Sequence, residues 1–342
     1  MSVTKTPLVS VIMSTYNDEE FINESISSIL NQTYNNFEFI IINDASNDDT
    51  KRILDNLLDD RLIIIHNKKN QKLAKNLNKA ISISKGKYIA RMDADDISLI
   101  NRMSIQVDFM ERNPDVDVVG SFAEKIGDQS GIISYPLKHE EIKDKLLFDN
   151  CMCHPSIMFR KSTLDYTYDE NCEAAQDYEL WSRIIWDKKF ANIPKPLLKY
   201  RIHSNQTRNK NGNNQKKGAK IARIQMIAHL MEIDENIYVY INKAFDYLTP
   251  KSHNELKCIE NVLLSIKKCN EKKNVFTNGI NKLIDKQFFY NWYISVGCDN
   301  IWIGDLKKSS LGYSYKKFSI NTFFKIIYRI ILNRRLSKIA KN

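Results

Sequence analysis

The sequence has little glycine and proline, and it lacks several kinds of segment. Only 10 of its 342 residues are glycine and 7 are proline, which excludes collagen-like and low-complexity chains. No apolar run approaches the ~18 residues of a membrane-spanning helix. The first ten residues lack the basic, apolar and small-residue regions of a signal peptide. We therefore expect a cytoplasmic protein whose 6 cysteines are reduced.

The excess positive charge is concentrated at the C-terminus. The net charge is +10, and residues 306–342 contain ten basic residues and no acidic one, so residues 1–305 are neutral overall. We therefore predict no nucleic-acid partner. Within this tail, the apolar residues of Phe323–Arg335 recur on one side of a helix, away from Lys325 and Arg329. The pattern predicts a basic amphipathic helix on an anionic membrane surface, and it leaves open a helix packed on the protein body.

Short apolar runs alternate with amphipathic stretches over the first 120 residues. The predicted strands are Leu8–Ser14, Phe37–Asn43, Leu62–His66, Lys87–Met92 and Val116–Gly120. The predicted helices are Glu19–Asn31, Asp49–Asp59, Lys72–Ser84 and Leu99–Arg112. This alternation predicts an α/β fold with a doubly wound, Rossmann-like and mostly parallel sheet. We expect ligands at the carboxyl ends of the strands.

The rest of the chain has a different pattern. A helix is expected near Glu140–Asp149, a strand near Ser156–Arg160 and a helix at Asp177–Asp187. The polar segment Arg208–Gly218 is expected to be mobile, either as a lid or as an ordinary loop, and the chain after it is expected to be helical. We predict four parts, namely residues 1–120, 121–207, 208–305 and the tail 306–342.

Polar clusters follow three of the predicted strands. They are Thr15–Glu19, Asn43–Ser46 and Arg91–Asp96. Neither of the common glycine-rich phosphate loops is present, so a phosphate bound beside these carboxylates needs a cation to offset repulsion. Mn²⁺ or Mg²⁺ prefers such oxygen ligands.

The Asp-x-Asp spacing is weak evidence by itself, because Asp115-Val116-Asp117 repeats it beside another strand. Asp93 and Asp95 differ in their context, since a strand precedes them and a third carboxylate follows. Spacing alone leaves two readings open, a metal–nucleotide site and solvated turn acids.

Five blocks in order resemble the family 2 inverting glycosyltransferases of the GT-A fold. The resemblance spans about residues 7–205. The blocks are Val9–Thr50, Tyr88–Ile97, Cys153–Ser162, Ala175–Arg183 and Tyr200–Thr207. The combination is most similar to bacterial enzymes that add β-1,3-linked galactose or N-acetylhexosamine to lipopolysaccharide, lipooligosaccharide or capsule chains.

The resemblance implies roles for individual residues. It assigns nucleotide-sugar binding to Thr15, Tyr16, Asn17, Glu19, Asp44, Asn78, Arg91 and Asp93. Asp44 matches the acid that hydrogen-bonds the uracil, and Asp96 matches a partner of the metal ligands. The resemblance assigns the binding of Mn²⁺ or Mg²⁺ to Asp93, Asp95 and His203. For His203 the alternative is an ordinary surface-loop histidine.

Asp177 matches the catalytic base of the family. A single displacement needs one carboxylate near the acceptor hydroxyl. An alternative role is the N-cap of the helix that follows Asp177. His154 and Pro155 match the acceptor-side wall, whereas Trp181 reads as a core residue.

The sequence departs from the family pattern at three places. Gln176 replaces a common glutamate before the base. Asn70-Gln71-Lys72 replaces a common Asn-x-Gly, so Lys72 either lies at the surface or reaches the diphosphate. Leu77 replaces an arginine, which puts an arginine–phosphate contact there in doubt.

The resemblance implies an enzyme that moves a hexose or N-acetylhexosamine from a UDP-sugar to a growing bacterial surface glycan. We expect a lipid-linked acceptor and a peripheral position on the inner face of the cytoplasmic membrane. A non-catalytic glycan- or nucleotide-binding protein with the same fold is the alternative. A nucleotidyltransferase would need a glycine-rich basic loop, which Ser10–Glu20 lacks.

Overall fold

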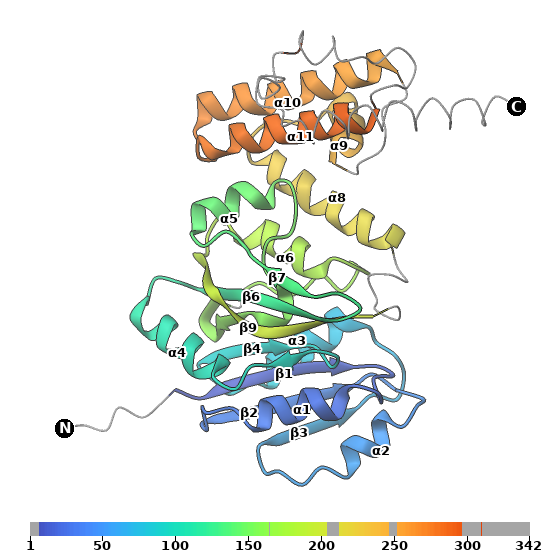
Figure 1. Cartoon of the computed structure of the whole chain (residues 1–342), viewed down its shortest axis with the longest axis vertical. Helices are drawn as coiled ribbons and strands as arrows, with labels where there is room; N and C mark the ends of the chain where they lie inside the picture. Colours follow the sequence, from blue (N-terminus) through green and yellow to red (C-terminus); the bar gives the residue numbers. More distant parts are fainter. Residues whose placement is uncertain (1–6, 164, 204–211, 246–251, 296–308, 310–342) are drawn as a thin grey trace, which may run out of the picture. The chain divides into compact units, whose positions relative to one another are not determined.

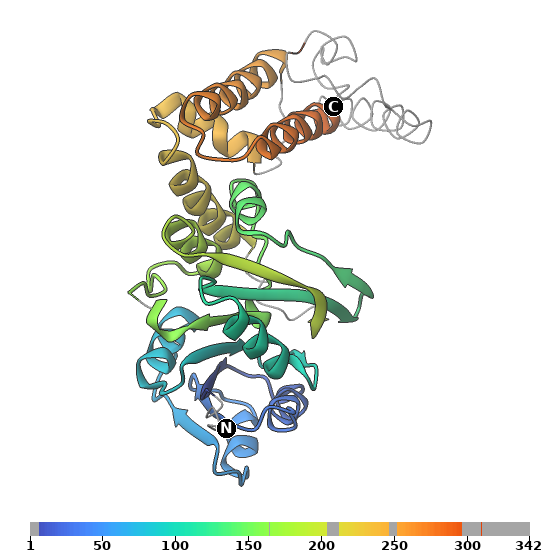
Figure 2. The same cartoon turned by 90° about the vertical axis from the view of Figure 1, so that its left-hand side faces the viewer.

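The computed structural model describes residues 7–163, 165–203, 212–245, 252–295 and 309 (Figures 1 and 2). The chain divides into two compact units. The first comprises Met1–Ile142 and Asp149–Ala222, and the second comprises Lys143–Phe148 and Arg223–Asn342. The predicted basic tail, residues 306–342, lies outside the described residues except for Ser309.

Nine strands of the first unit form one sheet in the order β3-β2-β1-β4-β8-β6-β9-β5, with β7 paired to β6. The strands are β1 (Val9–Thr15), β2 (Phe37–Asn43), β3 (Leu62–His66), β4 (Tyr88–Met92), β5 (Ile97–Ser98), β6 (Val118–Gly127), β7 (Gly131–Ile133), β8 (Met158–Arg160) and β9 (Phe190–Ile202).

Strands β3, β2, β1 and β4 are parallel, whereas β8 is antiparallel to both β4 and β6. Strand β9 is parallel to β6 and antiparallel to β5. The fold class predicted from the sequence is confirmed, and β8 makes the sheet mixed. The strand predicted at Val116–Gly120 begins two residues later and continues to Gly127.

The helices that begin in the first unit are α1 (Ile22–Leu30), α2 (Thr50–Asp55), α3 (Leu73–Ile83), α4 (Arg102–Arg112), α5 (His139–Leu146), α6 (Gln176–Ile184) and α8 (Gly212–Ala228), and the short 3-10 turns are η1 (His154–Ser156) and η2 (Lys161–Thr163). Helices α1 and α3 lie on opposite faces of the sheet (Figure 2). Ile26 of α1 and Met103 of α4 share one core with Val11 and Phe39. Strands β1, β2 and β4 are buried on both faces, which explains their nearly continuous apolar runs.

Arg208–Gly218 was predicted to be a mobile segment. This prediction is wrong from Gly212 onward, because α8 begins there. Residues 208–211 lie outside the described part of the chain. Long-range contacts favour the helix despite its polar sequence. The Asn214 side chain donates to Glu173, and Gly218 packs on Ala174.

The second unit contains α9 (Glu235–Phe245), α10 (His253–Lys273) and α11 (Gly279–Ser295). Ile259 and Leu263 of α10 are buried, as are Ile284 and Trp292 of α11. Helix α10 begins with a capping interaction, in which Ser252 Oγ accepts a hydrogen bond from the Glu255 amide. This helical region agrees with the pattern expected from the sequence.

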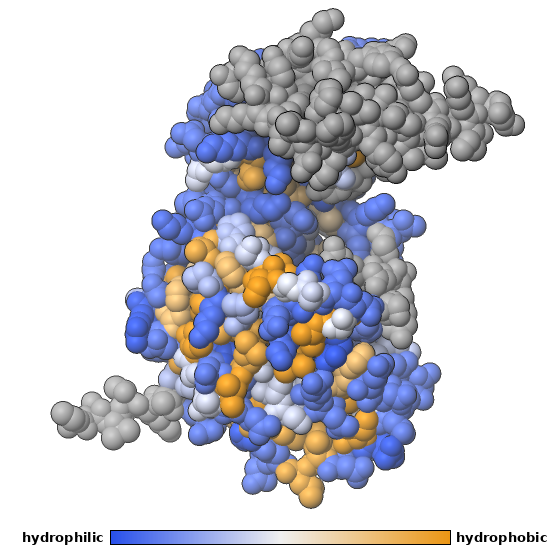
Figure 3. All heavy atoms as spheres, viewed as in Figure 1, coloured by the Kyte–Doolittle hydropathy of each residue, from blue (hydrophilic) through white to orange (hydrophobic). Residues whose placement is uncertain are grey.

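The surface of the first unit seen in Figure 3 mixes hydrophobic and hydrophilic side chains. Single exposed apolar side chains of this kind are normal for a folded domain. Among the described residues, every helix is either too short or too polar to cross a membrane.

Candidate active site

Loops at the carboxyl ends of the parallel strands form the candidate site. The loops that follow β1, β2, β3 and β4 are residues 16–21, 44–49, 67–72 and 93–96. Because these strands are parallel neighbours, the loops meet at one edge of the sheet, where open α/β sheets bind ligands. Asn17, Ala45 and Lys72 in these loops have positive φ angles. Such strain often accompanies functional sites, which supports this edge as the place of binding.

The loops after β1 and β2 are joined by hydrogen bonds through two of the predicted site residues. The Asn17 amide donates to Ser46 Oγ at 3.0 Å, and Asn17 Oδ1 accepts from the Asn47 amide at 2.9 Å. Glu19 Oε2 accepts from the Asp49 amide at 2.7 Å. Asn17 and Glu19 therefore shape the rim of the site by holding its two loops together.

Asp18 is a site residue that the sequence analysis missed, although it lies among four predicted ones. Its Oδ2 atom accepts hydrogen bonds from Thr15 Oγ1 at 2.7 Å and from the Tyr16 amide at 3.0 Å. Burial raises the pKa of Asp18 to about 6 despite these two hydrogen bonds, and repulsion from Asp95 adds to the rise. Tyr16 is 48% exposed, and its role in nucleotide binding stays a prediction.

Asp44 is buried and organises the loop after β3. Its Oδ1 atom accepts from Asn67 Nδ2 at 2.9 Å and from the Gln71 amide at 2.8 Å, and its Oδ2 atom accepts from the Lys72 amide at 2.9 Å. Lys72 Nζ pairs with Glu173 Oε1 at 2.7 Å, so its side chain bridges to the segment before α6. The role of Asp44 at the uracil stays a prediction.

Asp93, Asp95 and Asp96 form an acidic cluster after β4. One carboxylate oxygen from each lies within 4.8 Å of the others. The buried Arg91 guanidinium makes a two-point ion pair with Asp93. Burial raises the pKa of Asp93 to about 6, and repulsion from Asp95 adds to the rise while Arg91 opposes it. Burial, together with repulsion from Asp95 and Asp93, raises the pKa of Asp96 well above its usual range.

Residues at the end of β9 contact the acidic cluster. His203 Nε2 lies 3.1 Å from Asp95 Oδ2, so His203 lies beside one of the two predicted aspartate ligands of the metal. The Arg201 amide donates to Asp96 Oδ1 at 2.8 Å, and Arg201 Nε donates to the Asp95 carbonyl oxygen at 2.8 Å. Asp96 Oδ2 is buried and has no hydrogen-bond partner among the described residues. An orphaned carboxylate oxygen inside an acidic cluster fits a divalent cation.

Asp177 lies in the first turn of α6. It is not the N-cap of the helix, because that position is occupied by Ala175, which has φ 57°. Asp177 Oδ2 accepts from Asn150 Nδ2 at 2.6 Å, and Oδ1 accepts from the Tyr178 amide at 2.8 Å. Burial raises the pKa of Asp177, while Arg91 acts in the opposite direction. Arg91 therefore acts electrostatically on both Asp93 and Asp177.

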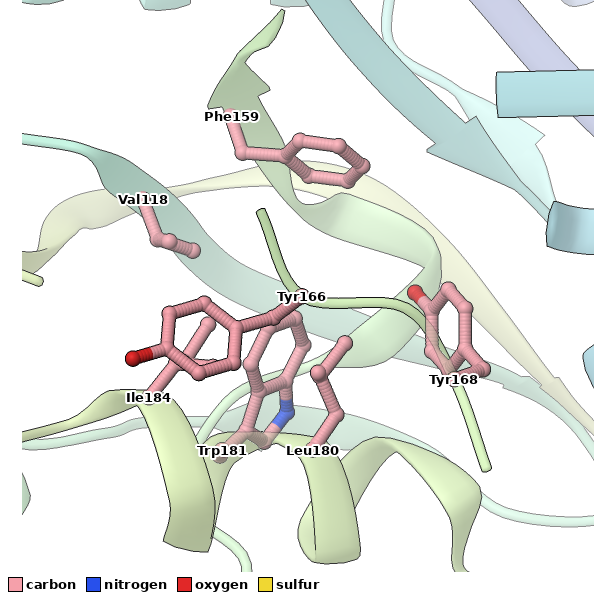
Figure 4. A pocket seen from close by; sticks show the side chains of 7 residues that line it. All are labelled: Val118, Phe159, Tyr166, Tyr168, Leu180, Trp181 and Ile184. Carbon is pink, nitrogen blue, oxygen red and sulfur yellow. The ribbon is translucent and has the colours of Figure 1, made fainter. Parts of the chain in front are cut away.

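An aromatic group lies beside α6. His154 Nε2 is 2.8 Å from the Tyr168 hydroxyl, and burial lowers the pKa of His154 well below its usual range, so its imidazole is neutral. Trp181 is almost fully buried, as expected of a core residue. Figure 4 shows the small apolar pocket in this region, which is lined by Val118, Phe159, Tyr166, Tyr168, Leu180, Trp181 and Ile184.

The Asn78 side chain forms hydrogen bonds with the backbone of Tyr168. Its Nδ2 atom donates to the Tyr168 carbonyl oxygen and its Oδ1 atom accepts from the Tyr168 amide, both at 2.9 Å. Its assignment to nucleotide-sugar binding stays a prediction. Asn150 and Arg201 were not predicted from the sequence. Asn150 lies four residues before His154, and Arg201 lies inside the block Tyr200–Thr207, so proximity to the motifs was the available signal.

Comparisons with known proteins identify the family of this chain. Residues 10–167 match the model of glycosyl transferase family 2. An uncharacterized glycosyltransferase of Haemophilus influenzae is 36% identical over 272 residues, which cover 74% of this chain and 84% of the relative. The O-antigen biosynthesis glycosyltransferase WbnJ of Escherichia coli is 37% identical over 226 residues, which cover 60% of this chain and 84% of WbnJ.

Solved structures share the fold at low sequence identity. TarS 1–349 of S. aureus has a TM-score of 0.57 and 16% identity, with 82% of this chain and 86% of that chain covered. The mannosyltransferase PcManGT of Pyrobaculum calidifontis has a TM-score of 0.50 and 14% identity, with 96% of this chain and 88% of that chain covered. The fold is thus that of the GT-A glycosyltransferases. The chain belongs to glycosyltransferase family 2, which confirms the resemblance found in its sequence.

Proposed function

We propose that the protein transfers a hexose or N-acetylhexosamine from a UDP-sugar to a hydroxyl of a growing bacterial surface glycan. The observation that carries this proposal is the presence of the acidic cluster and the half-buried Asp177 in one compact unit, with Arg91 acting on both. WbnJ is an O-antigen biosynthesis enzyme, and the TarS structure is a complex with UDP-GlcNAc. The first supports a polysaccharide product, and the second supports a UDP-sugar donor.

Asp93, Asp95 and His203 are our candidates for holding Mn²⁺ or Mg²⁺, and the orphaned Asp96 Oδ2 fits the same ion. The related mannosyltransferase structure contains GDP-Man and Mn²⁺. When bound, such an ion would neutralise charge on the departing diphosphate. The rim residues Thr15, Tyr16, Asn17, Glu19 and Asp44 would bind the uracil and ribose, with the exposed Tyr16 ring as the stacking surface.

Asp177 is the base in this proposal. The acceptor hydroxyl oxygen forms a bond to the anomeric carbon while the bond from that carbon to the diphosphate breaks. The hydroxyl proton passes to the Asp177 carboxylate. One displacement from the face opposite the diphosphate inverts the anomeric centre, so an α-linked donor gives a β-linked product. Burial suits Asp177 to this role because a raised pKa makes its carboxylate a stronger base.

The acceptor and the membrane position rest on the sequence of residues 306–342, which lie outside the described residues except for Ser309. We assign a lipid-linked acceptor and a peripheral place on the inner face of the cytoplasmic membrane. Truncation before Leu306 is expected to release the protein from anionic vesicles while UDP release from the donor continues. Co-sedimentation of the truncated protein with those vesicles would refute the membrane role of the tail.

The function is tested by UDP release from UDP-galactose, UDP-glucose, UDP-N-acetylglucosamine and UDP-N-acetylgalactosamine with Mn²⁺ present. We expect release from one donor, loss of release in EDTA, and a fall of about 10²- to 10⁴-fold in Asp177→Asn. Asp108→Asn, an exposed acid on α4, is the matched control and is expected to behave as wild type. A thermal shift with Mn²⁺ that is lost in Asp96→Asn would support the metal site without relying on turnover.

Calorimetry with UDP distinguishes the remaining readings. Absence of binding to UDP or any other nucleotide would refute the transferase proposal. Nucleotide binding without turnover of any donor, even with glycan acceptors supplied, would favour the alternative of a non-catalytic glycan- or nucleotide-binding protein.

A further inference from the structure

Asn150 has a side-chain amide whose orientation is determined by its neighbours. It lies between α5 and η1 in the first unit. Its Oδ1 atom accepts a hydrogen bond from the Met152 amide at 3.1 Å, and its Nδ2 atom donates to Asp177 Oδ2 at 2.6 Å. Because a backbone N–H can only donate, the Asn150 oxygen must face Met152. The NH₂ group must therefore face Asp177.

This hydrogen bond adds a second constraint on the Asp177 carboxylate. Its other oxygen, Oδ1, already accepts from the Tyr178 amide at 2.8 Å. Two donors on two different oxygens fix both the position and the plane of the carboxylate. The Asp177 backbone amide also hydrogen-bonds to this carboxylate. An ionised carboxylate has about four acceptor positions, so at least one remains for an acceptor hydroxyl.

We propose that Asn150 is a positioning residue, which orients the Asp177 carboxylate toward the acceptor hydroxyl and favours its ionised form. This inference rests on the proposed role of Asp177 as base. The other charged or titratable groups that act on Asp177 are Arg91 of β4 and the side chains of Tyr168 and Cys172 in the segment before α6. Among these groups Arg91 alone is cationic, and Asn150 adds a neutral donor at hydrogen-bond distance.

Asn150→Asp separates positioning of the base from support of the local backbone. The variant keeps the side-chain shape and the oxygen that accepts from Met152, but it loses the donor and adds a negative charge beside Asp177. We expect UDP release at neutral pH to fall about 10- to 100-fold, a part of what a general base contributes. The acid limb of the kcat/KM profile should move to higher pH, because the carboxylate that must be ionised is no longer stabilised.

Asn150→Ser removes the donor without adding a charge and is expected to move the acid limb in the same direction, by less. It also serves as the test variant if Asn150→Asp does not fold. Asn56→Ala, which removes an exposed amide at the end of α2, is the matched control and should keep the wild-type rate and profile. UDP affinity measured by calorimetry should be the same in all four proteins.

The outcomes separate this inference from the proposed function. A wild-type rate and pH profile in folded Asn150→Asp, with Asp177→Asn inactive, would overturn the positioning role and leave the base intact. An active Asp177→Asn enzyme would instead overturn the base assignment. A loss of UDP affinity equal to the loss of rate would also overturn the positioning role, because the defect would then lie in donor binding.

Discussion

Gly218 of α8 packs directly on the carbonyl group of Ala174. A β-carbon at Gly218 would lie 2.0 Å from the Ala174 oxygen and 3.0 Å from the Ala175 β-carbon. Ala175 has a positive φ angle and immediately precedes α6, which carries Asp177. The close approach of α8 therefore supports the strained turn that places the candidate base.

Gly218→Ala is expected to displace either α8 or this turn. Overpacking of this kind costs about 1–3 kcal/mol of unfolding free energy. UDP release should fall more than UDP affinity, because the turn determines the position of Asp177 and not that of the nucleotide loops. Urea unfolding, calorimetry and the UDP-release assay measure the three quantities. Lys217→Ala, at the exposed neighbouring position, is the control, and an equally small effect of both variants would contradict the bracing role.

Lys72 has φ 68° and ψ 164°, a backbone conformation that suits glycine. Strain of this kind costs about 1–3 kcal/mol. Its exposed ion pair with Glu173 contributes at most about 1 kcal/mol. Lys72→Gly keeps the amide that donates to Asp44, so we expect unchanged or slightly higher stability in urea. Lys75→Gly, inside α3, should lose about 1 kcal/mol. An equal loss in both variants would show that Lys72 is not strained.

Asp18 predicts a pH dependence of stability in the metal-free protein. Its pKa is raised from 3.8 to about 6, chiefly by burial, so the folded state retains a proton that the unfolded state has lost. Its contribution to stability therefore falls as the pH rises through this interval. Melting temperatures in EDTA should show Asp18→Asn gaining on wild type from pH 4 to pH 7.

Asp55 provides the opposite case for comparison. Its hydrogen bond with Lys51 lowers its pKa, so it stabilises the fold once it is ionised. From pH 4 to pH 7, Asp55→Asn should therefore be less stable than wild type by a small and nearly constant amount. The contribution of Asp55 is lost only below its ordinary pKa of 3.8, and it is small because the pair is exposed. Parallel curves for wild type and Asp18→Asn would refute the raised pKa of Asp18.

The sequence was most informative about the parallel half of the sheet. Phe37–Asn43 and Leu62–His66 were predicted with the same bounds that the structure has. A fully buried strand such as Phe37–Asn43 needs an unbroken apolar run, and the partly buried edge strand Leu62–His66 has a similar run. The polar clusters after the strands could be placed at one edge because the carboxyl ends of parallel strands coincide. The grouping of Asp93 with Asp95 followed from this rule and from their spacing along the chain.

Contacts between distant residues decided the remainder. The sequence predicts a strand near Ser156–Arg160 but not the antiparallel place of β8 between β4 and β6. Asn150 and Asp177 are 27 residues apart, and no local pattern relates them. The apolar periodicity and the family motifs by themselves determined the fold class, the acidic cluster and the candidate base. The tertiary structure alone decided how that base is oriented, because hydrogen bonds and steric contacts between separate segments depend on where the folded chain brings them together.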